Sequence, residues 1–182
     1  MEGKRENPLA AQSKQWMLEA LLQLMNKKDY SGITIKELCI KAGVDRKTFY
    51  RHFKSKDEIL ELPVREACDR YISELKKLPE LNSFEITESY FHICAEYADF
   101  FGLLDRHGLL PLLLKKFDEY LPRLNELFSA DPLYRKKSPY ELIYQAGGFW
   151  NVTVQWIRNG QREKPGRMAG IISSIMPASL TT

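Results

Sequence analysis

The sequence has few of the residues on which metal binding and disulfide cross-linking depend. It contains only three cysteines, Cys39, Cys68 and Cys94, which are odd in number, isolated from one another and without a CxxC pair. This pattern argues against a disulfide framework and against a zinc site, and it is compatible with a reducing compartment. We therefore expect no metal site.

The common catalytic motifs are absent as well. The chain has no GxSxG, HExxH, GxGxxG or P-loop pattern, and its three histidines, His52, His92 and His107, share no motif with a nucleophile. We therefore expect that the protein is not an enzyme and needs no cofactor.

Long apolar runs are also missing. No apolar segment reaches the roughly 18 residues that a membrane span requires, and none follows the charged start MEGKRENP. The composition, 44% hydrophobic and 28% charged over 182 residues, is ordinary for a globule with a buried core. We expect a soluble, unprocessed, cytoplasmic protein without a membrane partner.

The small net charge of +3 conceals an asymmetry along the chain. Residues 1–56 contain 12 lysines and arginines against 6 acidic residues, whereas the remainder contains 15 against 18. Cationic charge is thus concentrated in the N-terminal third, as in a nucleic-acid-binding domain.

Within that cationic third, two short helices separated by a glycine turn are predicted. Thr34 and Glu37 form a capping box that starts the first helix, and Gly43 stands where a helix end favours a left-handed residue. An apolar stripe faces the core, formed by Ile35, Leu38, Cys39 and Ala42.

Asp45 can cap the second helix, whose buried anchors are Phe49 and Phe53, four residues apart. The same helix offers side-chain donors suited to a major groove, namely Arg46, Lys47, Thr48, Tyr50, Arg51 and His52. Ser55 and Glu58 predict a further helix from Lys56, whose N-terminus can bind a phosphate.

The pattern ITIKELCIKAGVDRKTFYRHFKSKDEIL resembles the DNA-binding part of TetR-like (TetR/AcrR) transcriptional regulators. The resemblance implies phosphate contacts at Thr34, Lys36, Thr48, Tyr50, His52 and Lys56. It implies base contacts at Arg46 and Lys47, and leaves Arg51 either on the DNA or in solvent. Tyr50 and His52 could instead be packing residues.

The remaining chain predicts an all-α protein of about nine helices. We expect a helix-turn-helix DNA-binding domain over residues 8–56, a linking helix over 56–78, and a helical effector-binding and dimerisation domain over 79–182. Further helices are expected over residues 84–104, 139–159 and 165–176, and the segment SADPLYRKKSP is expected to be a loop.

In TetR-like proteins the middle of the chain holds an inducer, and here it is rich in large side chains. The candidate pocket residues are Phe91, His92, Phe100, Phe101, Phe117, Tyr120, Gln145 and Phe149. Aromatic residues at helical spacing could equally form plain core.

The last two helices usually form a homodimer in that family. The candidate interface residues are Ile143, Gly147, Trp150, Val154, Ile157, Ile171, Ile172 and Ile175. A two-fold dimer would present two recognition helices to half-sites of a double-stranded operator about one DNA turn apart. These apolar faces could alternatively be buried within their own domain.

Together these features predict a DNA-binding regulator, in all expectation a repressor, that binds a palindromic operator and responds to a small molecule or a protein in its C-terminal domain. The C-terminal part is similar to a subgroup that includes regulators of dihydroxyacetone kinase operons, where the signal can be a protein. The alternative is a helical adaptor or coactivator that signals through a protein partner.

Overall fold

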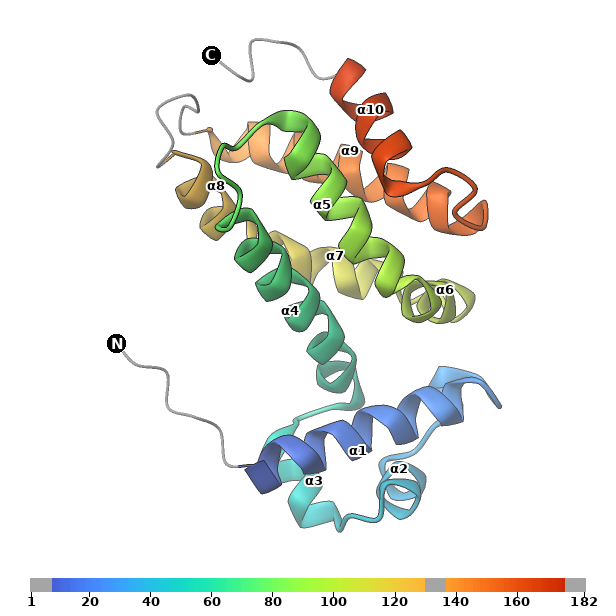
Figure 1. Ribbon diagram of the computed structural model, residues 1–182. Coiled ribbons are helices and arrows are strands. Elements are labelled where there is room, and N and C mark those ends of the chain that lie inside the picture. Colours follow the sequence, from blue (N-terminus) through green and yellow to red (C-terminus); the bar gives the residue numbers. More distant parts are fainter. Residues whose placement is uncertain (1–7, 130–136, 176–182) are drawn as a thin grey trace. The chain divides into compact units, whose positions relative to one another are not determined.

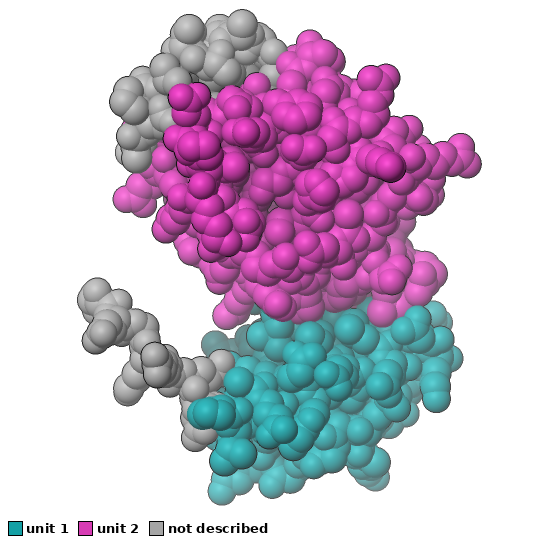
Figure 2. All heavy atoms as spheres, viewed as in Figure 1, with its two compact units in different colours: residues 1–62 teal, residues 63–182 magenta. Residues whose placement is uncertain are grey.

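The computed structural model describes residues 8–129 and 137–175, and it divides into two compact units, residues 1–62 and 63–182 (Figure 2). All regular structure in the described ranges is helical (Figure 1). The elements are α1 (Pro8–Met25), the 3₁₀ helix η1 (Tyr30–Gly32), α2 (Ile35–Ala42), α3 (Arg46–His52), α4 (Lys56–Leu75), α5 (Ser83–Glu96), α6 (Ala98–Arg106), α7 (Leu110–Asp118), α8 (Leu121–Ser129), α9 (Pro139–Arg158) and α10 (Pro165–Ile175).

In unit 1, α1 packs against α2 and α3. Its core is built from side chains that the helical spacing places on facing stripes, and six of them are fully enclosed: Met17, Leu21, Leu38, Phe49, Ile59 and Leu60. The three-helix arrangement leaves the opposite faces of α2 and α3 open to solvent.

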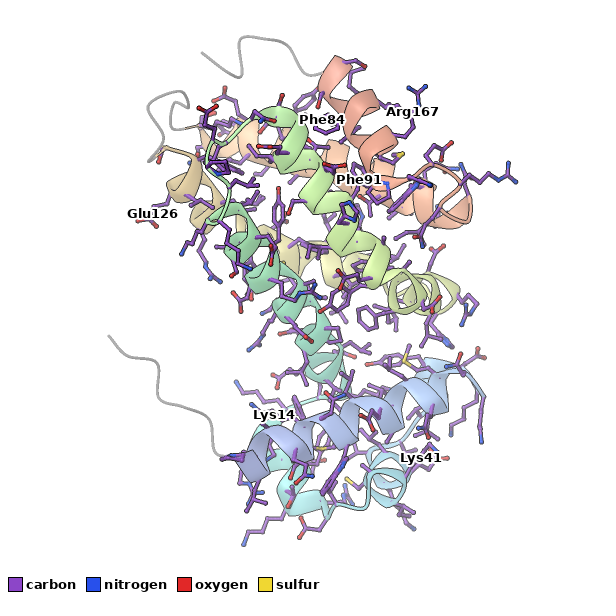
Figure 3. The ribbon with its side chains drawn as sticks, in the orientation of Figure 1. Lys14, Lys41, Phe84, Phe91, Glu126 and Arg167 are labelled. Carbon is purple, nitrogen blue, oxygen red and sulfur yellow. The ribbon has the colours of Figure 1, made fainter. Side chains whose placement is uncertain are left out.

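In unit 2, α5 packs along α10, and α9 contacts α6, α7 and α8. Figure 3 labels Phe91 on α5, which lies in a buried cluster with Cys94, Trp156, Met168 and Ile172. The Phe91 and Trp156 rings meet edge to face with centroids 5.3 Å apart, a favourable aromatic geometry. These residues connect α5, α9 and α10.

Charged pairs at the surface of unit 2 join further helices. Arg70 on α4 binds Glu96 on α5 through two hydrogen bonds of 2.6 and 3.0 Å, and Arg158 on α9 binds Asp105 on α6 likewise. Exposed pairs of this kind contribute little individually, so the apolar contacts dominate the packing.

Two expectations about helix bounds need comment. The single helix expected over residues 84–104 is wrong, because the chain leaves the helical conformation at Tyr97 (φ −100°, ψ 12°) and divides into α5 and α6. Most of the expected loop SADPLYRKKSP lies outside the described residues.

None of the helices in the described ranges is long and apolar enough to cross a membrane.

Candidate DNA-binding surface and ligand cavity

The turn between α2 and α3 forms as the sequence predicts. Gly43 has φ +67°, and its N–H donates to the carbonyl of Ile40, while the N–H of Val44 donates to the carbonyl of Cys39 at 3.0 Å. These two bonds define a Schellman motif, which ends α2 and satisfies carbonyls that would otherwise lack a partner. The glycine is required because an L side chain is strained at this φ.

Both helices of the motif are capped by side chains. The Thr34 hydroxyl accepts from the Glu37 N–H at 3.2 Å, and the Glu37 carboxylate accepts from the Thr34 N–H at 3.0 Å, as the predicted capping box requires. Lys28 donates to the same carboxylate at 2.6 Å, and these bonds, led by the one from Lys28, lower the pKa of Glu37 to about 2. Asp45 accepts from the Thr48 N–H at 2.6 Å and is therefore a cap.

Helix α3 presents its polar side chains outward from two buried rings. Phe49 and Phe53 are buried, with ring centroids 6.0 Å apart, and they anchor the helix to the unit 1 core. Four predicted contact residues are exposed on the other faces: Arg46, Lys47, Tyr50 and Arg51. The Arg46 guanidinium lies 6.0 Å from the centroid of the Tyr50 ring, so the two side chains share one surface.

Tyr50 is 53% exposed, which makes it a surface residue with an accessible hydroxyl. Thr48 and His52 are half-buried at the edges of α3, while Thr34 and Lys36 are exposed at the start of α2. The structure therefore brings the predicted DNA contacts of α2 and α3 to the solvent side of unit 1.

Lys56 makes several contacts within unit 1. Its ammonium donates to the backbone carbonyls of Tyr30 and of Ile33, the second at 2.9 Å, and lies 4.1 Å from the centroid of the Tyr30 ring. The Tyr30 hydroxyl in turn donates to Asp57. Because these bonds hold the ammonium against the chain before α2, Lys56 supports that segment. The predicted phosphate contact of Lys56 stays a prediction.

The start of α4 also differs in one detail from the predicted capping box. Glu58 accepts from the N–H of Lys54 at 2.8 Å, one residue before the expected partner Ser55. Acidic side chains in this first turn, Asp57 and Glu58, face the positive end of the α4 dipole.

A cavity of about 400 Å³ occupies the interior of unit 2. Five of the predicted pocket residues line it: Phe101, Phe117, Tyr120, Gln145 and Phe149. Its other walls come from α4, α5, α8, α9 and α10, and include Cys68, Tyr71, Tyr90, Leu121, Phe128, Leu142 and Ser173. A volume of this size is within the range of small-molecule sites.

Three predicted pocket residues do not line the cavity. Phe91 is fully buried in the α5, α9 and α10 cluster, and Phe100, the immediate neighbour of Phe101, is buried away from the cavity. His92 is exposed on the opposite side of α5. Adjacent residues on a helix point about 100° apart, so an aromatic-rich run cannot supply one wall with all its members.

The polar residues of the cavity were largely missed by the sequence reasoning. The Tyr71 hydroxyl donates to the carbonyl of Ile86 at 3.1 Å, and the hydroxyls of Tyr90 and Thr153 are 2.9 Å apart. Burial raises the pKa of Tyr90. Lys137, which reads in the sequence as a solvated loop residue, also lines the cavity. For Tyr71 the sequence did hold a signal, because this residue lies at helical spacing among the apolar residues of α4.

Part of the predicted dimer stripe packs within unit 2. Ile172 is buried in its own unit, Trp150 lines the cavity with its ring 5.4 Å from that of Phe117, and Val154 and Ile157 line a small internal gap between α6, α7 and α9. The sequence marked these residues by spacing alone, which identifies an apolar face but not what covers it.

The large apolar side chains that α9 and α10 expose are only partly those predicted for the dimer interface. On α9 these are Tyr140, Ile143 and Tyr144, with exposed fractions of 85, 59 and 83%. On α10 they are Ile171 and Ile175. Gly147 and Gly148 continue the α9 surface, and a Cβ added at either would meet no atom within 4 Å.

Comparison with known proteins agrees with the geometry of unit 1. Residues 17–62 match the family described as bacterial regulatory proteins, tetR family. Unit 1 contains a tetR-family DNA-binding domain. The matched range covers α2, α3, the turn between them and the start of α4, which are the elements that expose the cationic surface.

Two relatives from Bacillus subtilis (strain 168) share this part of the chain. Both are described as uncharacterized HTH-type transcriptional regulators: YxbF is 35% identical over 66 residues, and YerO is 33% identical over 61 residues. The matches cover 36 and 34% of this chain, and the chain spans only 17 and 20% of the length of these relatives. They therefore concern the DNA-binding domain.

Solved structures extend the similarity of fold to the whole chain. Lin0861 from Listeria innocua has a TM-score of 0.81 over 95% of this chain and 93% of its own. The fatty acid degradation regulator FadR from Bacillus halodurans has a TM-score of 0.62 over 94 and 96%. Each is 14% identical, so these similarities show the all-α fold alone. The resemblance to the dihydroxyacetone kinase subgroup stays a prediction.

Proposed function

We propose that the protein is a cytoplasmic, sequence-specific transcriptional repressor that binds a palindromic operator as a homodimer and is controlled by an effector in the unit 2 cavity. The observation that carries the proposal is α3, a short helix in a tetR-family domain. Its four exposed donor side chains, Arg46, Lys47, Tyr50 and Arg51, project from a helix fixed by two buried phenylalanines.

In this proposal, α3 lies in the major groove. Arg46 and Lys47, in its first turn, reach base edges, because the N-terminal residues of a recognition helix approach the bases most closely. Tyr50, Thr48, His52, Thr34 and Lys36 contact phosphates around them, and Arg51 adds a further charge. Lys56 contributes indirectly, by holding the segment that precedes α2.

Control by an effector is supported by the course of α4. This helix begins at Lys56 in unit 1, and its later residues Ala67, Cys68, Tyr71 and Ile72 line the cavity of unit 2. A ligand that displaces α4 in the cavity would thus act on the helix that follows the DNA-binding domain. Such coupling lowers operator affinity only if the ligand favours the conformation that cannot bind DNA.

Dimerisation is assigned to the exposed apolar faces of α9 and α10. Tyr140, Ile143, Tyr144, Ile171 and Ile175 are large, apolar and exposed, and the open surface at Gly147 permits close approach of a second helix. Two copies of these faces can form a four-helix interface with two-fold symmetry. Ile143→Glu combined with Tyr144→Glu is expected to give a monomer in sedimentation velocity at micromolar concentration.

The test of the proposed function is DNA binding by the full chain. We expect labelled DNA from upstream of its own gene to bind at least about a thousandfold more tightly than unrelated DNA, with affinity falling steeply as salt rises. Arg46→Ala together with Lys47→Ala should abolish the preference. Lys115→Ala together with Lys164→Ala, two lysines of unit 2, is the matched control. Absence of salt-sensitive binding would favour the adaptor.

A further inference from the structure

Aromatic rings form much of the lining of the unit 2 cavity. They occur in two groups, in which neighbouring rings meet edge to face or tilted, with centroids 5.1–6.4 Å apart: Tyr71, Tyr90 and Phe149 in the first group, and Phe101, Phe117 and Trp150 in the second. Helix α9 supplies one ring to each group. Such a lining offers both faces and edges of rings to a planar ligand.

The hydroxyl groups of this lining are largely used within the protein. The Tyr71 hydroxyl donates to the carbonyl of Ile86 at 3.1 Å. The Thr153 hydroxyl donates to the carbonyl of Phe149 at 2.8 Å, so Tyr90 is the donor in its 2.9 Å contact with Thr153. Both tyrosines therefore line the cavity with their hydroxyl hydrogens already donated to the protein.

Charge is scarce in the same lining. Among the described residues that line the cavity there is no carboxylate, and the ammonium of Lys137 donates to the side-chain oxygen of Gln145 at 2.9 Å. A cation would find no carboxylate there. An anion would leave water for a mostly apolar lining whose lysine is already hydrogen-bonded within the protein, which is costly. The lining thus favours an uncharged ligand.

One polar atom of the lining is unsatisfied. The hydroxyl oxygen of Ser173, a residue that lines the cavity, is buried and has no hydrogen-bond partner among the residues that the structure describes. Such a hydroxyl costs free energy, which a ligand atom at hydrogen-bond distance would recover. Ser173 directly follows Ile172, which belongs to the buried cluster against which Tyr90 and Phe149 pack. Ser173 and these two rings thus come from neighbouring helices, α10, α5 and α9 (Figure 1).

We propose that the ligand of the cavity is an uncharged, planar aromatic molecule with one hydrogen-bonding group, of the kind represented by a naphthol. This inference rests on the proposed function of the cavity as the effector site. The aromatic body packs against the rings of α5, α7 and α9, and its polar group forms a hydrogen bond with the Ser173 hydroxyl.

The test compares four probes of similar size on the full protein by equilibrium dialysis at pH 7: naphthalen-2-ol, 2-methylnaphthalene, naphthalene-2-carboxylate and trimethyl(naphthalen-2-yl)ammonium. Naphthalen-2-ol should bind about 2- to 12-fold more tightly than 2-methylnaphthalene, which is the net worth of one hydrogen bond expressed as affinity. Each ion should bind at least about tenfold more weakly than naphthalen-2-ol, because its charge loses its hydration.

A saturated probe tests the role of the rings. Decahydronaphthalen-2-ol has the carbon skeleton and the hydroxyl of naphthalen-2-ol but no aromatic faces. Phe149→Leu should weaken the binding of naphthalen-2-ol about 2- to 12-fold more than that of the saturated alcohol, since one aromatic pair is worth that factor beyond its buried area. Phe84→Leu is the matched control and should change neither affinity, because this ring, labelled in Figure 3, is 42% exposed and does not line the cavity.

Variants of α10 test the hydrogen bond. Ser173→Ala should bring naphthalen-2-ol to the affinity of 2-methylnaphthalene and leave the affinity of the hydrocarbon unchanged. Ser174→Ala is the matched control, because this exposed serine lies outside the cavity and donates to the carbonyl of Ile171 at 2.7 Å. Circular dichroism and the melting temperature establish that each variant is folded.

The inference is overturned if either ion binds as tightly as naphthalen-2-ol or if naphthalen-2-ol does not bind. It is equally overturned if Phe149→Leu weakens both alcohols alike, or if Ser173→Ala keeps the preference for the hydroxyl. Salt-sensitive DNA binding by the ligand-free protein is measured in parallel. Any of these results with intact DNA binding overturns the ligand class alone, whereas loss of DNA binding removes the proposed function.

Discussion

Replacement of Lys56 by methionine tests whether this lysine holds the segment before α2 or contacts DNA directly. The substitution keeps the length of the side chain and removes both hydrogen bonds to the carbonyls of Tyr30 and Ile33. It also removes the charge over the Tyr30 ring. The Ile33 carbonyl then loses the lysine donor, whereas the Tyr30 carbonyl still accepts from the Ile33 N–H at 3.1 Å.

The expected cost follows from these contacts. A hydrogen bond to a charged group is worth about 1.5–3 kcal/mol. Burial lowers the pKa of Lys56, which shows that desolvation of the ammonium offsets part of the gain. A net loss of about 2–4 kcal/mol remains from the two bonds, a large part of the 5–15 kcal/mol that typically stabilises a domain.

Hydrogen exchange read by mass spectrometry is the suitable assay, because it reports on unit 1 separately from unit 2. Protected amides of residues 30–40 should exchange about 30- to 700-fold faster in Lys56→Met, at tenfold for each 1.4 kcal/mol. Lys54→Met is the matched control: it removes the same charge from an exposed neighbour and should change exchange by less than about threefold.

The opposite result would refute the reasoning. If Lys56→Met exchanges like the unsubstituted protein but loses DNA affinity, the ammonium contacts phosphate and the bonds to Tyr30 and Ile33 carry little free energy.

Three further predictions concern the turn, the surface of α3 and the buried thiols. Gly43→Ala should destabilise unit 1 by about 1 kcal/mol in chemical unfolding, because alanine is strained at a φ of +67°. The added Cβ would meet no atom within 4 Å, so backbone strain alone contributes. An unchanged unfolding midpoint would contradict this prediction. Tyr50→Phe should weaken binding to specific and unrelated DNA alike, by about 0.5–1.5 kcal/mol in fluorescence anisotropy. The salt dependence should stay unchanged, because no charge is lost; unchanged affinity would contradict the phosphate contact. Burial raises the pKa of Cys68 and of Cys94 to about 12, so little thiolate is present at neutral pH. A disulfide reagent should therefore react slowly with both thiols, at a rate that rises with pH. Fast reaction of the native protein at pH 7 would contradict this prediction.

The local structure of unit 1 could be predicted from the sequence because each feature depends on neighbours in the chain. The capping box at Thr34 and Glu37, the glycine turn at Gly43 and the Asp45 cap all formed as expected. Each is a bond between residues three to five apart, which spacing specifies directly. The contacts of Lys56 with the Tyr30 and Ile33 carbonyls could not be predicted, because these partners lie more than twenty residues away.

The candidate site of unit 2 could be predicted only in part, because helical spacing identifies an apolar face without naming its neighbour. Phe101 and Phe117, two of the predicted pocket residues, line the cavity, whereas two predicted interface residues have neighbours in their own unit: Ile172 is buried and Trp150 lines the cavity. Lys137 could not be found from the sequence, since its position depends on the two hydrogen bonds from Asn125, twelve residues earlier. The described ranges contain ten α-helices, one more than the expected nine, because the break at Tyr97 divides one expected helix into two.

The central claim is sequence-specific DNA recognition by α3, and selection of bound sequences from a random DNA pool with the full protein tests it most directly. The account predicts enrichment of one inverted repeat with half-site centres about one helical turn apart, and loss of that repeat with the Arg46→Ala, Lys47→Ala variant. A pool that remains random after repeated selection would contradict it.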